Sequence, residues 1–172
     1  MKILNAVFLI IVLVLLPGHL LFADVAYKQI MGWTENAKID QENLLIRAKL
    51  DTGAENSSIN APHFKKFIRK GSEWVRFDLT NHLDKKVTIE RKVVRAVKIK
   101  IENSHPGYEE RVVIKLRICV GKYSKEVEVN LNDRSDYRYQ LLLGRSFLEG
   151  IIIVDPSIQF TNKPNCKGRS GS

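Results

Sequence analysis

Residues 49–55 read Lys-Leu-Asp-Thr-Gly-Ala-Glu and close an apolar stretch, so a carboxylate, Asp51, stands where a strand is expected to end and the backbone to turn. Glycine lets the backbone approach a neighbouring group closely, and the Thr52 hydroxyl can fix such a turn. A carboxylate held in this way can activate water, which is the chemistry of aspartic proteases. A lone Asp-Thr-Gly also occurs as an ordinary turn, so a second motif is needed to distinguish the two.

The chain around this turn alternates between apolar and polar side chains, as strands do. Residues 44–50 are predicted to form the strand that ends at Asp51, and the alternation is clearest over residues 112–120. Short polar turns separate these segments, which predicts antiparallel hairpins because a parallel crossover needs a longer connection. A first strand is expected at residues 25–33, ended by Gly32 and the polar residues 34–36. Further strands are expected at 73–79, 87–101, 123–131, 141–143 and 151–154, with a short basic helical turn at 63–70.

The first 23 residues have the three parts of a secretory signal, namely Lys2, an apolar run over residues 6–16, and the small residue Ala23 after a Pro-Gly pair. We expect cleavage after Ala23 and a periplasmic or secreted location. The alternative is an uncleaved inner-membrane anchor, although the run is short beside the ~20 apolar residues of a membrane span. The rest of the 172-residue chain predicts one domain over residues 24–160 and a flexible tail over residues 161–172.

The chain is basic, with a formal net charge of +9, and seven of its cations lie between Lys85 and Lys100. This run can attract an acidic peptide or an anionic surface, and a solvated strand face explains it equally well. Nucleic acid is not an expected partner, because no basic motif is interleaved with aromatic residues. The two cysteines, Cys119 and Cys166, lack the spacing of a zinc site, and the sequence leaves open whether they form a disulfide.

A second informative stretch lies far downstream, where the apolar run Leu141 to Leu143 stops at Gly144-Arg145 before an expected helical turn. The two stretches together resemble the retropepsin-like aspartic proteases, in which D-T-G-A is followed by two apolar residues, glycine and arginine. The chain resembles more closely the bacterial single-domain retropepsin-like proteins that were historically labelled ATP-dependent zinc proteases. This resemblance covers nearly the whole mature chain. The residues that support this identification are Gly32-Trp33, 49–54, 74–77, 110–114, 142–145 with Leu148, and 154–156.

This resemblance implies a mainly β fold, namely a closed, single-lobe, retropepsin-like β-barrel with one short helix, and an aspartic peptidase activity. It assigns catalysis to Asp51. In the family pattern the acidic residue after D-T-G-A meets the arginine of the second motif, so we expect an ion pair between Glu55 and Arg145; two solvated side chains are the alternative. The residues that the resemblance assigns to support of the catalytic loop are Thr52, Gly53, Ala54, Glu55, Gly144 and Arg145.

The chain departs from the family pattern at positions that affect substrate choice rather than the catalytic carboxylate. Residues 56–58 read Asn-Ser-Ser in place of a Thr-Ser-Ala type of run, Val112 follows Arg111 where a proline is common, and Asp133-Arg134 replaces an Asn-Arg pair. Arg111 and Arg134 are expected to bind a substrate carboxylate, in agreement with the family's association with glutamate-rich substrates. A structural salt bridge is the alternative for each arginine.

The zinc and the ATP of the historical label find no support in the sequence. No H-E-x-x-H motif occurs, and His63, His82 and His105 stand alone without the spacing of zinc ligands. No G-x-x-x-x-G-K followed by Ser or Thr is present to hold ATP phosphates. We therefore expect neither a metal nor another cofactor.

A pepsin-type mechanism needs two carboxylates that share one proton, and this chain has a single D-T-G. We therefore expect a homodimer in which Asp51 of each subunit meets at the two-fold axis and acts on a peptide or protein substrate. The turn at residues 103–107 is the expected flap over this site. The competing class is a non-catalytic exported β-domain that binds a peptide, an acidic partner or an envelope component.

Overall fold

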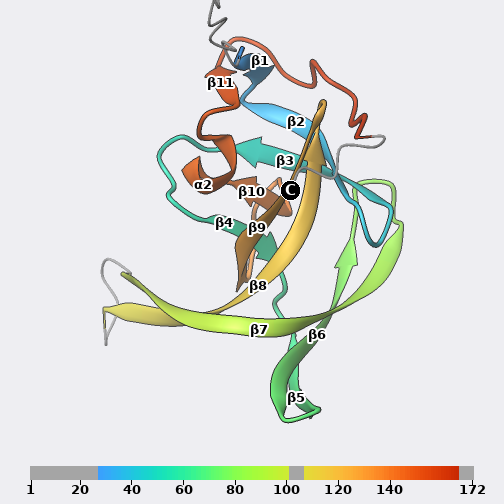
Figure 1. Ribbon diagram of the computed structural model, residues 1–172, viewed down its shortest axis with the longest axis vertical. Coiled ribbons are helices and arrows are strands. Elements are labelled where there is room, and N and C mark those ends of the chain that lie inside the picture. The colour runs from blue at the N-terminus through green and yellow to red at the C-terminus, as the bar shows by residue number, and fades with distance from the viewer. Residues whose placement is uncertain (1–26, 101–106, 167–172) are drawn as a thin grey trace, which may run out of the picture.

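The computed structural model describes residues 27–100 and 107–166 (Figure 1). The expected signal (residues 1–23), residues 103–106 of the expected flap and residues 167–172 of the expected tail lie outside the described residues. Within the described ranges no helix is long and apolar enough to cross a membrane. The elements are β1 (Gln29–Gly32), β2 (Thr34–Ile39), β3 (Leu44–Leu50), β4 (Ser57–Asn60), β5 (Lys65–Arg69), β6 (Ser72–Thr80), β7 (Lys86–Lys100), β8 (Tyr108–Val120), β9 (Tyr123–Asn132), β10 (Leu141–Leu143), α2 (Arg145–Leu148) and β11 (Ile152–Asp155).

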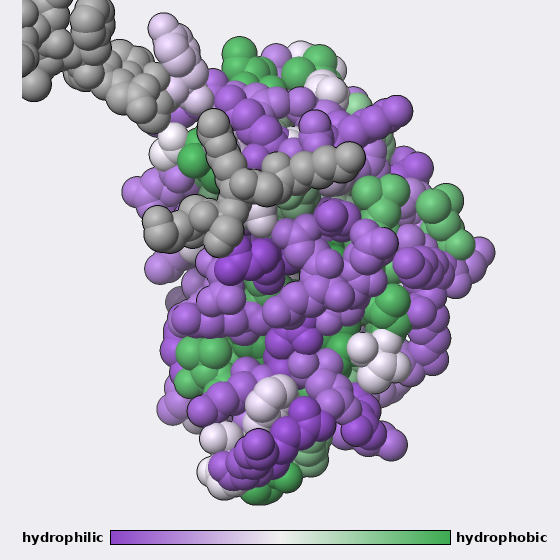
Figure 2. Space-filling model, turned by 45° about the vertical axis from the view of Figure 1, so that its right-hand side comes forward, coloured by the Kyte–Doolittle hydropathy of each residue, from purple (hydrophilic) through white to green (hydrophobic). Residues whose placement is uncertain are grey.

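Six strands close into a barrel in the order β2-β3-β10-β4-β9-β8, and pairing of β2 with β8 completes the ring. The alternating apolar residues of the strands point inward, and Ile46, Ala48, Ile114 and Leu116 are buried in the core. The outer face drawn in Figure 2 is mostly hydrophilic, with hydrophobic side chains in separate patches. The predicted mainly β architecture, a closed barrel with one short helix, is confirmed for the part of the chain that the structure describes.

Strand β7 belongs both to the barrel and to an arm that projects from it (Figure 1). Its C-terminal half pairs with β8, and its N-terminal half pairs with β6, which in turn pairs with β5. A register shift between Val93 and Arg95 marks the point where β7 leaves the barrel. The pairs β6–β7, β7–β8 and β8–β9 are antiparallel, as predicted.

The predicted helical turn at residues 63–70 is wrong, because β5 in this segment is a strand paired with β6. Lys70 and Gly71 have φ values of 51° and 72°, the backbone of a two-residue hairpin turn rather than a helix. The hairpin sets Phe67 opposite Trp74, and the Arg69 guanidinium lies 5.1 Å and 4.7 Å from the two ring centroids. Pairing with a neighbouring strand therefore overrides the local helical preference.

The first strand, β1, ends at Gly32 as predicted, but the polar run at residues 34–36 begins β2 instead of a turn. Glu35 in this run is fully buried, and backbone donors satisfy its carboxylate. Gly32 N donates to Glu35 Oε1 at 2.8 Å, and Asn162 N donates to Glu35 Oε2 at 3.0 Å. A charged residue is accommodated inside this strand because its oxygens have hydrogen-bond partners.

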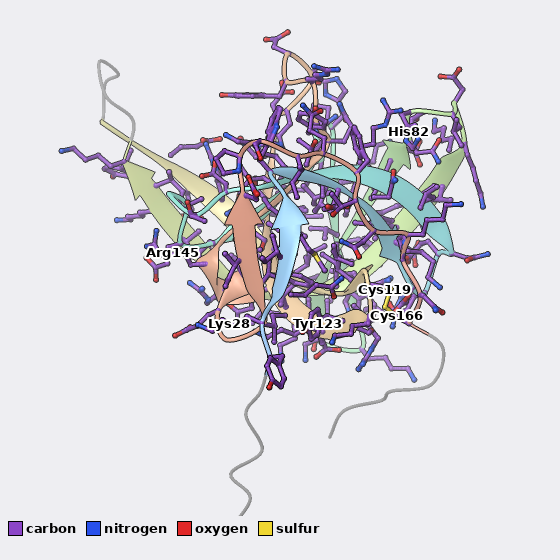
Figure 3. The ribbon with its side chains drawn as sticks, turned by 90° about the horizontal axis from the view of Figure 1, so that it is seen from above. Lys28, His82, Cys119, Tyr123, Arg145 and Cys166 are labelled. Carbon is purple, nitrogen blue, oxygen red and sulfur yellow. A yellow bond between two sulfur atoms is a disulfide. The ribbon has the colours of Figure 1, made fainter. Side chains whose placement is uncertain are left out.

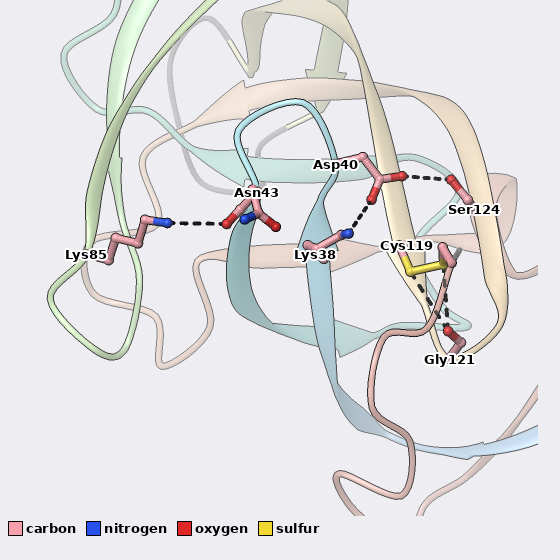
Figure 4. A network of polar contacts seen from close by, with 8 residues as sticks. Lys38, Asp40, Asn43, Lys85, Cys119, Gly121 and Ser124 are labelled. Carbon is pink, nitrogen blue, oxygen red and sulfur yellow. Dashed lines mark hydrogen bonds and ion pairs between the residues drawn. A yellow bond between two sulfur atoms is a disulfide. The ribbon is translucent and has the colours of Figure 1, made fainter. Parts of the chain in front are cut away.

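A hydrogen bond and a disulfide hold residues 161–166 against the barrel. The prediction that these residues form a flexible tail is therefore wrong for this segment. Asn165 N donates to a carbonyl of the turn between β8 and β9 at 2.7 Å, and Cys166 forms a disulfide with Cys119 of β8. Figure 3 shows this disulfide on the side of the molecule away from Arg145, and Figure 4 shows it beside the same turn. The structure thus answers the question that the sequence left open about the two cysteines.

Candidate active site

The D-T-G turn begins at the end of β3, where parallel pairing with β10 sets Leu50 beside Leu143. Asp51 N donates to Leu143 O at 2.9 Å and so extends the ladder by one residue. Gly53 N donates to Asp51 Oδ1 at 3.0 Å, and Ala54 N donates to Asp51 O at 3.3 Å. The Asp51 side chain is therefore oriented by the turn that follows it.

Gly144 lies directly against the backbone of the D-T-G turn. A Cβ at this position would stand 2.6 Å from Asn56 O and 2.9 Å from Ala54 O, closer than real side chains come. Gly144 N donates to Ser57 Oγ at 3.2 Å, and Arg145 N donates to Ala54 O at 2.9 Å. Only glycine permits this approach, so the two motifs quoted from the sequence form one unit in space.

The Arg145 side chain stabilises the turn through backbone carbonyls. Its Nη1 donates to Thr52 O at 3.1 Å and to Gly53 O at 2.9 Å. The expected Glu55–Arg145 ion pair is not formed, because Glu55 is exposed and these carbonyls take up the guanidinium instead. Glu55 meets the second motif through its own carbonyl, which accepts from Ser146 N at 3.0 Å.

Asp51 lines a cavity of about 500 Å³ at one end of the barrel strands. Arg111 of β8 and Arg134, which follows β9, line the same cavity. The structure thus brings together the residue that the resemblance assigns to catalysis and the two that it assigns to substrate binding. The other lining residues include the exposed carboxylate Glu55 together with Lys49, Ser58, Asn130, Asn132 and Tyr137.

Arg134 is the buried cation of this cavity, with only 5% of its surface exposed. Its Nη1 donates to Ser58 Oγ and its Nε donates to Tyr139 O, both at 3.1 Å, which fixes the guanidinium. The pKa of Arg134 lies below its ordinary value, mainly because of burial and also because of the Arg111 charge, while Tyr137 and Asp51 act in the opposite direction; a guanidinium nevertheless stays protonated in proteins. No carboxylate pairs with Arg134 among the ion pairs of the described residues, and its guanidinium lies 4.8 Å from the ring centroid of Tyr137, which lines the same cavity.

Arg111 has a carboxylate partner. Its Nη2 lies 2.7 Å from Glu109 Oε2, and its Nε donates to the same oxygen at 2.7 Å. The two residues stand two positions apart on β8, which places their side chains on the same face of the strand. For Arg111 the alternative, a structural salt bridge, is therefore formed, and of the two residues only Arg111 lines the cavity.

Lys49 pairs with Asp51, its Nζ lying 3.1 Å from Asp51 Oδ2. Burial raises the pKa of Asp51, but hydrogen bonds from Lys49 and from the Gly53 N–H lower it, and the result is a pKa below the ordinary value. Asp51 is therefore ionised at neutral pH. Our sequence analysis missed Lys49, although its position two residues before Asp51 at the end of a strand is a usable signal, because such residues share a face.

A family model described as the retropepsin-like aspartic endopeptidase RimB, or RimB-like, matches residues 30–165. The chain belongs to this family. The RimB-like match includes the D-T-G turn, Gly144 and both cavity arginines, and it ends at residue 165, one position before Cys166. It confirms the predicted family and, with the closed barrel, the predicted retropepsin-like fold.

Curated relatives of the RimB-like chain are named as ligases rather than as peptidases. A probable alpha-L-glutamate ligase of Shewanella pealeana is 37% identical over 129 residues, which are 73% of this chain and 27% of the ligase. A probable alpha-L-glutamate ligase of Desulfotalea psychrophila is 31% identical over 138 residues, which are 79% of this chain and 30% of that protein. The chain therefore spans less than a third of the length of these relatives, and the ligase name describes the whole of those proteins.

A solved structure has the same fold. Protein Lpg0085 of Legionella pneumophila, whose function is unknown, is 32% identical and superposes with a TM-score of 0.67 over 80% of this chain and 100% of its own length. This RimB-like chain thus shares its fold with the whole of that solved chain.

One buried polar atom of the RimB-like cavity lacks a partner in the described structure. Asn130 is 5% exposed, lines the cavity, and its Oδ1 accepts no hydrogen bond there. A buried polar group without a partner costs free energy, so a bound molecule that donates to Asn130 would relieve this cost. Our sequence analysis missed Asn130, because a single asparagine in a strand belongs to no motif.

Proposed function

We propose that the chain is an aspartic endopeptidase that hydrolyses peptide bonds in acidic or glutamate-rich substrates. The main support is that Asp51, Arg111 and Arg134 line one cavity of about 500 Å³. A carboxylate that can activate water lies there together with guanidinium groups, which bind carboxylates by charge-assisted hydrogen bonds. Membership of a retropepsin-like endopeptidase family supports the same activity.

The proposed substrate class draws on the cavity and on the relatives. Arg134 is buried and fixed by two hydrogen bonds, so we assign it the main contact with a substrate carboxylate, and Arg111 a second one. Two relatives are named as glutamate ligases, and a substrate that contains glutamate is acidic. The ligase activity itself is not carried over, because this chain matches less than a third of each ligase.

The second carboxylate in our mechanism is Asp51 of a second copy of the chain. One Asp51 takes a proton from water while the water oxygen attacks the peptide carbonyl carbon, and the other, protonated, donates its proton to the carbonyl oxygen. The C–N bond then breaks as a proton passes to the leaving nitrogen. Thr52 and Gly53 are exposed at the tip of the turn, which leaves the loop accessible to a second copy.

Lys49 has a defined place in this scheme. In the single chain it keeps Asp51 ionised, as a general base must be. When a second Asp51 approaches, repulsion between like charges raises the pKa of one carboxyl of the pair, which then holds the shared proton. The dyad therefore forms only when two subunits meet.

We also propose that the domain acts outside the cytoplasm, after export through its N-terminal segment. The disulfide between Cys119 and Cys166 supports this location, since disulfides persist in oxidising compartments. A cleaved signal and a retained anchor differ in whether residues 1–23 are present in the mature protein, which intact-mass measurement of the purified protein distinguishes.

The test of the activity compares the purified wild-type chain with Asp51→Asn on glutamate-rich peptides across a range of pH, with products identified by mass spectrometry. Asp51→Asn keeps the shape of the side chain and removes the base. Asp78→Asn is the matched control, since Asp78 is an exposed carboxylate of the arm that pairs with Lys86. We expect cleavage by wild type and Asp78→Asn and none by Asp51→Asn.

Cleavage that persists in Asp51→Asn would overturn the assignment of the catalytic residue. Equal binding of the peptides by all three proteins without any cleavage would support the competing class, a non-catalytic exported β-domain that binds an acidic partner. That outcome would leave the cavity arginines as the binding residues and Asp51 without a catalytic role.

A further inference from the structure

A second cavity, of about 510 Å³, lies where β7 leaves the barrel for the arm. Trp74 of β6 and Val94, which is 43% exposed, supply its apolar wall. The charged residues around it are mostly cations, since Glu126 is the only carboxylate among the lining residues. The cations are Arg91, Lys92, Lys115 and Arg117.

Several of these cations have charge or donors left for a ligand. Arg91 pairs with Glu42 at 2.5 Å, yet its buried Nε has no hydrogen-bond partner in the described structure. Lys115 lies 3.8 Å from Glu126, which is a loose pair between half-exposed side chains. Neither Lys92 nor Arg117 belongs to an ion pair formed by residues 27–100 and 107–166. The cavity is therefore suited to carboxylates attached to an aliphatic or aromatic frame.

Strand β8 connects this cavity with the one at Asp51. Arg111 lines the Asp51 cavity, whereas Lys115 and Arg117 line the second cavity. Alternate residues of a strand point to the same side, so these three share the outer face of β8, opposite the core residues Ile114 and Leu116. At about 3.3 Å per residue, Arg111 and Arg117 stand roughly 20 Å apart, a distance that an extended peptide of about six residues spans.

Among the described residues, the stretch of β8 and β9 between the two cavities carries one carboxylate on this face, and it is paired. Glu128 of β9 lies opposite Lys115 in the register, and it forms an ion pair with Arg95 at 2.7 Å. Val113 and Asn130, the next pair along the strands, are both buried, so a peptide passes over what covers them, and Asn130 already belongs to the Asp51 cavity. An acidic peptide can therefore lie along this face without passing an uncompensated negative charge.

We propose that the second cavity is an exosite for the same acidic substrate. It binds carboxylates of a peptide segment whose other end enters the Asp51 cavity. Lys92 and Arg117 make the charged contacts, and Trp74 and Val94 contact the aliphatic parts of the side chains. The inference rests on the substrate class of the proposed function, but it does not depend on cleavage.

The test uses the full chain with Asp51→Asn, so that no peptide is cut, and measures binding of two fluorescently labelled oligoglutamates by anisotropy at low salt. One peptide has about four residues and reaches one cavity, and the other has about ten residues and reaches both. We expect the longer peptide to bind more tightly. Adding Lys92→Gln and Arg117→Gln should weaken its binding about fivefold and remove most of its advantage over the short peptide.

The matched control adds Lys66→Gln and Lys122→Gln, which remove two exposed positive charges that line neither cavity. Equal weakening by both pairs of substitutions would overturn the exosite, because it would show a general effect of net charge. Binding to phosphatidylglycerol vesicles that depends on Lys92 and Arg117, without any advantage of the longer peptide, would also overturn it.

This experiment can reject the exosite proposal and the peptidase proposal independently of each other. If the wild-type chain cleaves none of the peptides, but the advantage of the longer peptide is lost only with Lys92→Gln and Arg117→Gln, the exosite stands and the proposed activity fails. If wild type cleaves both peptides with equal efficiency and binds them equally well, the activity stands and the exosite is overturned.

Discussion

Lys49 Nζ lies 3.1 Å from Asp51 Oδ2, so the carboxylate that we assign to catalysis is held in its ionised form by a lysine of its own strand. The pair explains why the pKa of Asp51 is low although burial alone would raise it. A single ionised carboxylate can act as the base toward water, but it cannot also donate a proton to the peptide carbonyl. The acid must come from elsewhere, and our account takes it from a second chain.

Replacing Lys49 by methionine should raise the pKa of Asp51, because a hydrogen bond and a positive charge that favour the carboxylate are removed. The low-pH limb of the cleavage profile should then move to higher pH. Lys49→Arg, which keeps the charge, is the control and should leave the limb close to that of wild type. A titration of the Asp51 carboxyl by NMR that is identical in wild type and Lys49→Met would contradict this role of Lys49.

The same pair predicts how stability depends on pH. Because the pKa of Asp51 in the folded chain lies below the unfolded value near 3.8, ionised Asp51 stabilises the folded state above that pH, and this contribution is lost as the pH falls through the folded pKa. Lys49→Met should therefore lose less stability than wild type on acidification. Urea unfolding at neutral pH and at acidic pH, for both proteins, measures the difference.

Gly144→Ala should destabilise the chain by about 1–3 kcal/mol, since the added methyl group meets the backbone of Asn56 and Ala54, which cannot move as a side chain does. The D-T-G turn should be displaced at the same time, so cleavage should fall by more than stability alone explains. Ser146→Ala, an exposed position two residues on, is the control. An unchanged urea midpoint for Gly144→Ala would show that the two motifs are not in close contact.

Arg145→Ala and Glu55→Gln should have different effects, although the resemblance pairs these residues. Arg145→Ala removes two hydrogen bonds to the D-T-G turn, and because the side chain is exposed we expect a loss of about 1 kcal/mol or less in the free energy of unfolding, with a clear loss of cleavage. Glu55→Gln removes no ion pair and should unfold as wild type does. Equal losses of stability in the two variants would indicate that the ion pair forms in solution.

Reduction of the disulfide between Cys119 and Cys166 should lower the free energy of unfolding by about 2–4 kcal/mol, because 47 positions separate the two residues in the chain. The site itself should keep its geometry, since Arg145 and the disulfide lie on opposite sides of the molecule in Figure 3. Thermal melts with and without dithiothreitol measure the effect. A variant with Cys119→Ser and Cys166→Ser should not respond to the reductant.

The parts of the fold that the sequence predicts are those in which local pattern and final environment agree. Residues 44–50 alternate and form a strand with one face in the core, and the motif at 142–145 lies where the resemblance places it, against the D-T-G turn. In residues 63–70 the local pattern and the final environment disagree, because these residues form a strand only through their pairing with β6. They disagree at the polar start of β2 as well, because the donors that satisfy buried Glu35 come partly from Asn162, far away in the chain.

The candidate site divides in the same way. Asp51 and Gly144 belong to motifs, and Lys49 could be found from its spacing. The absence of a carboxylate partner for Arg134 among the described residues and the unpartnered Oδ1 of Asn130 depend on which residues the folded barrel sets around them, and no local pattern reports those neighbours. Arg145 binds the carbonyls of Thr52 and Gly53 instead of the Glu55 carboxylate, and this choice of partners depends on the final conformation of the turn.

The most direct test of the central claim, that Asp51 from two chains forms one catalytic site, is a mixing experiment. Wild type and Asp51→Asn are unfolded together, refolded at a constant total concentration, and assayed on a glutamate-rich peptide. If each site needs two wild-type chains, an equal mixture should retain about one quarter of the wild-type activity. Retention of about one half, in direct proportion to the wild-type fraction, would mean that a single chain cleaves alone and would contradict the account.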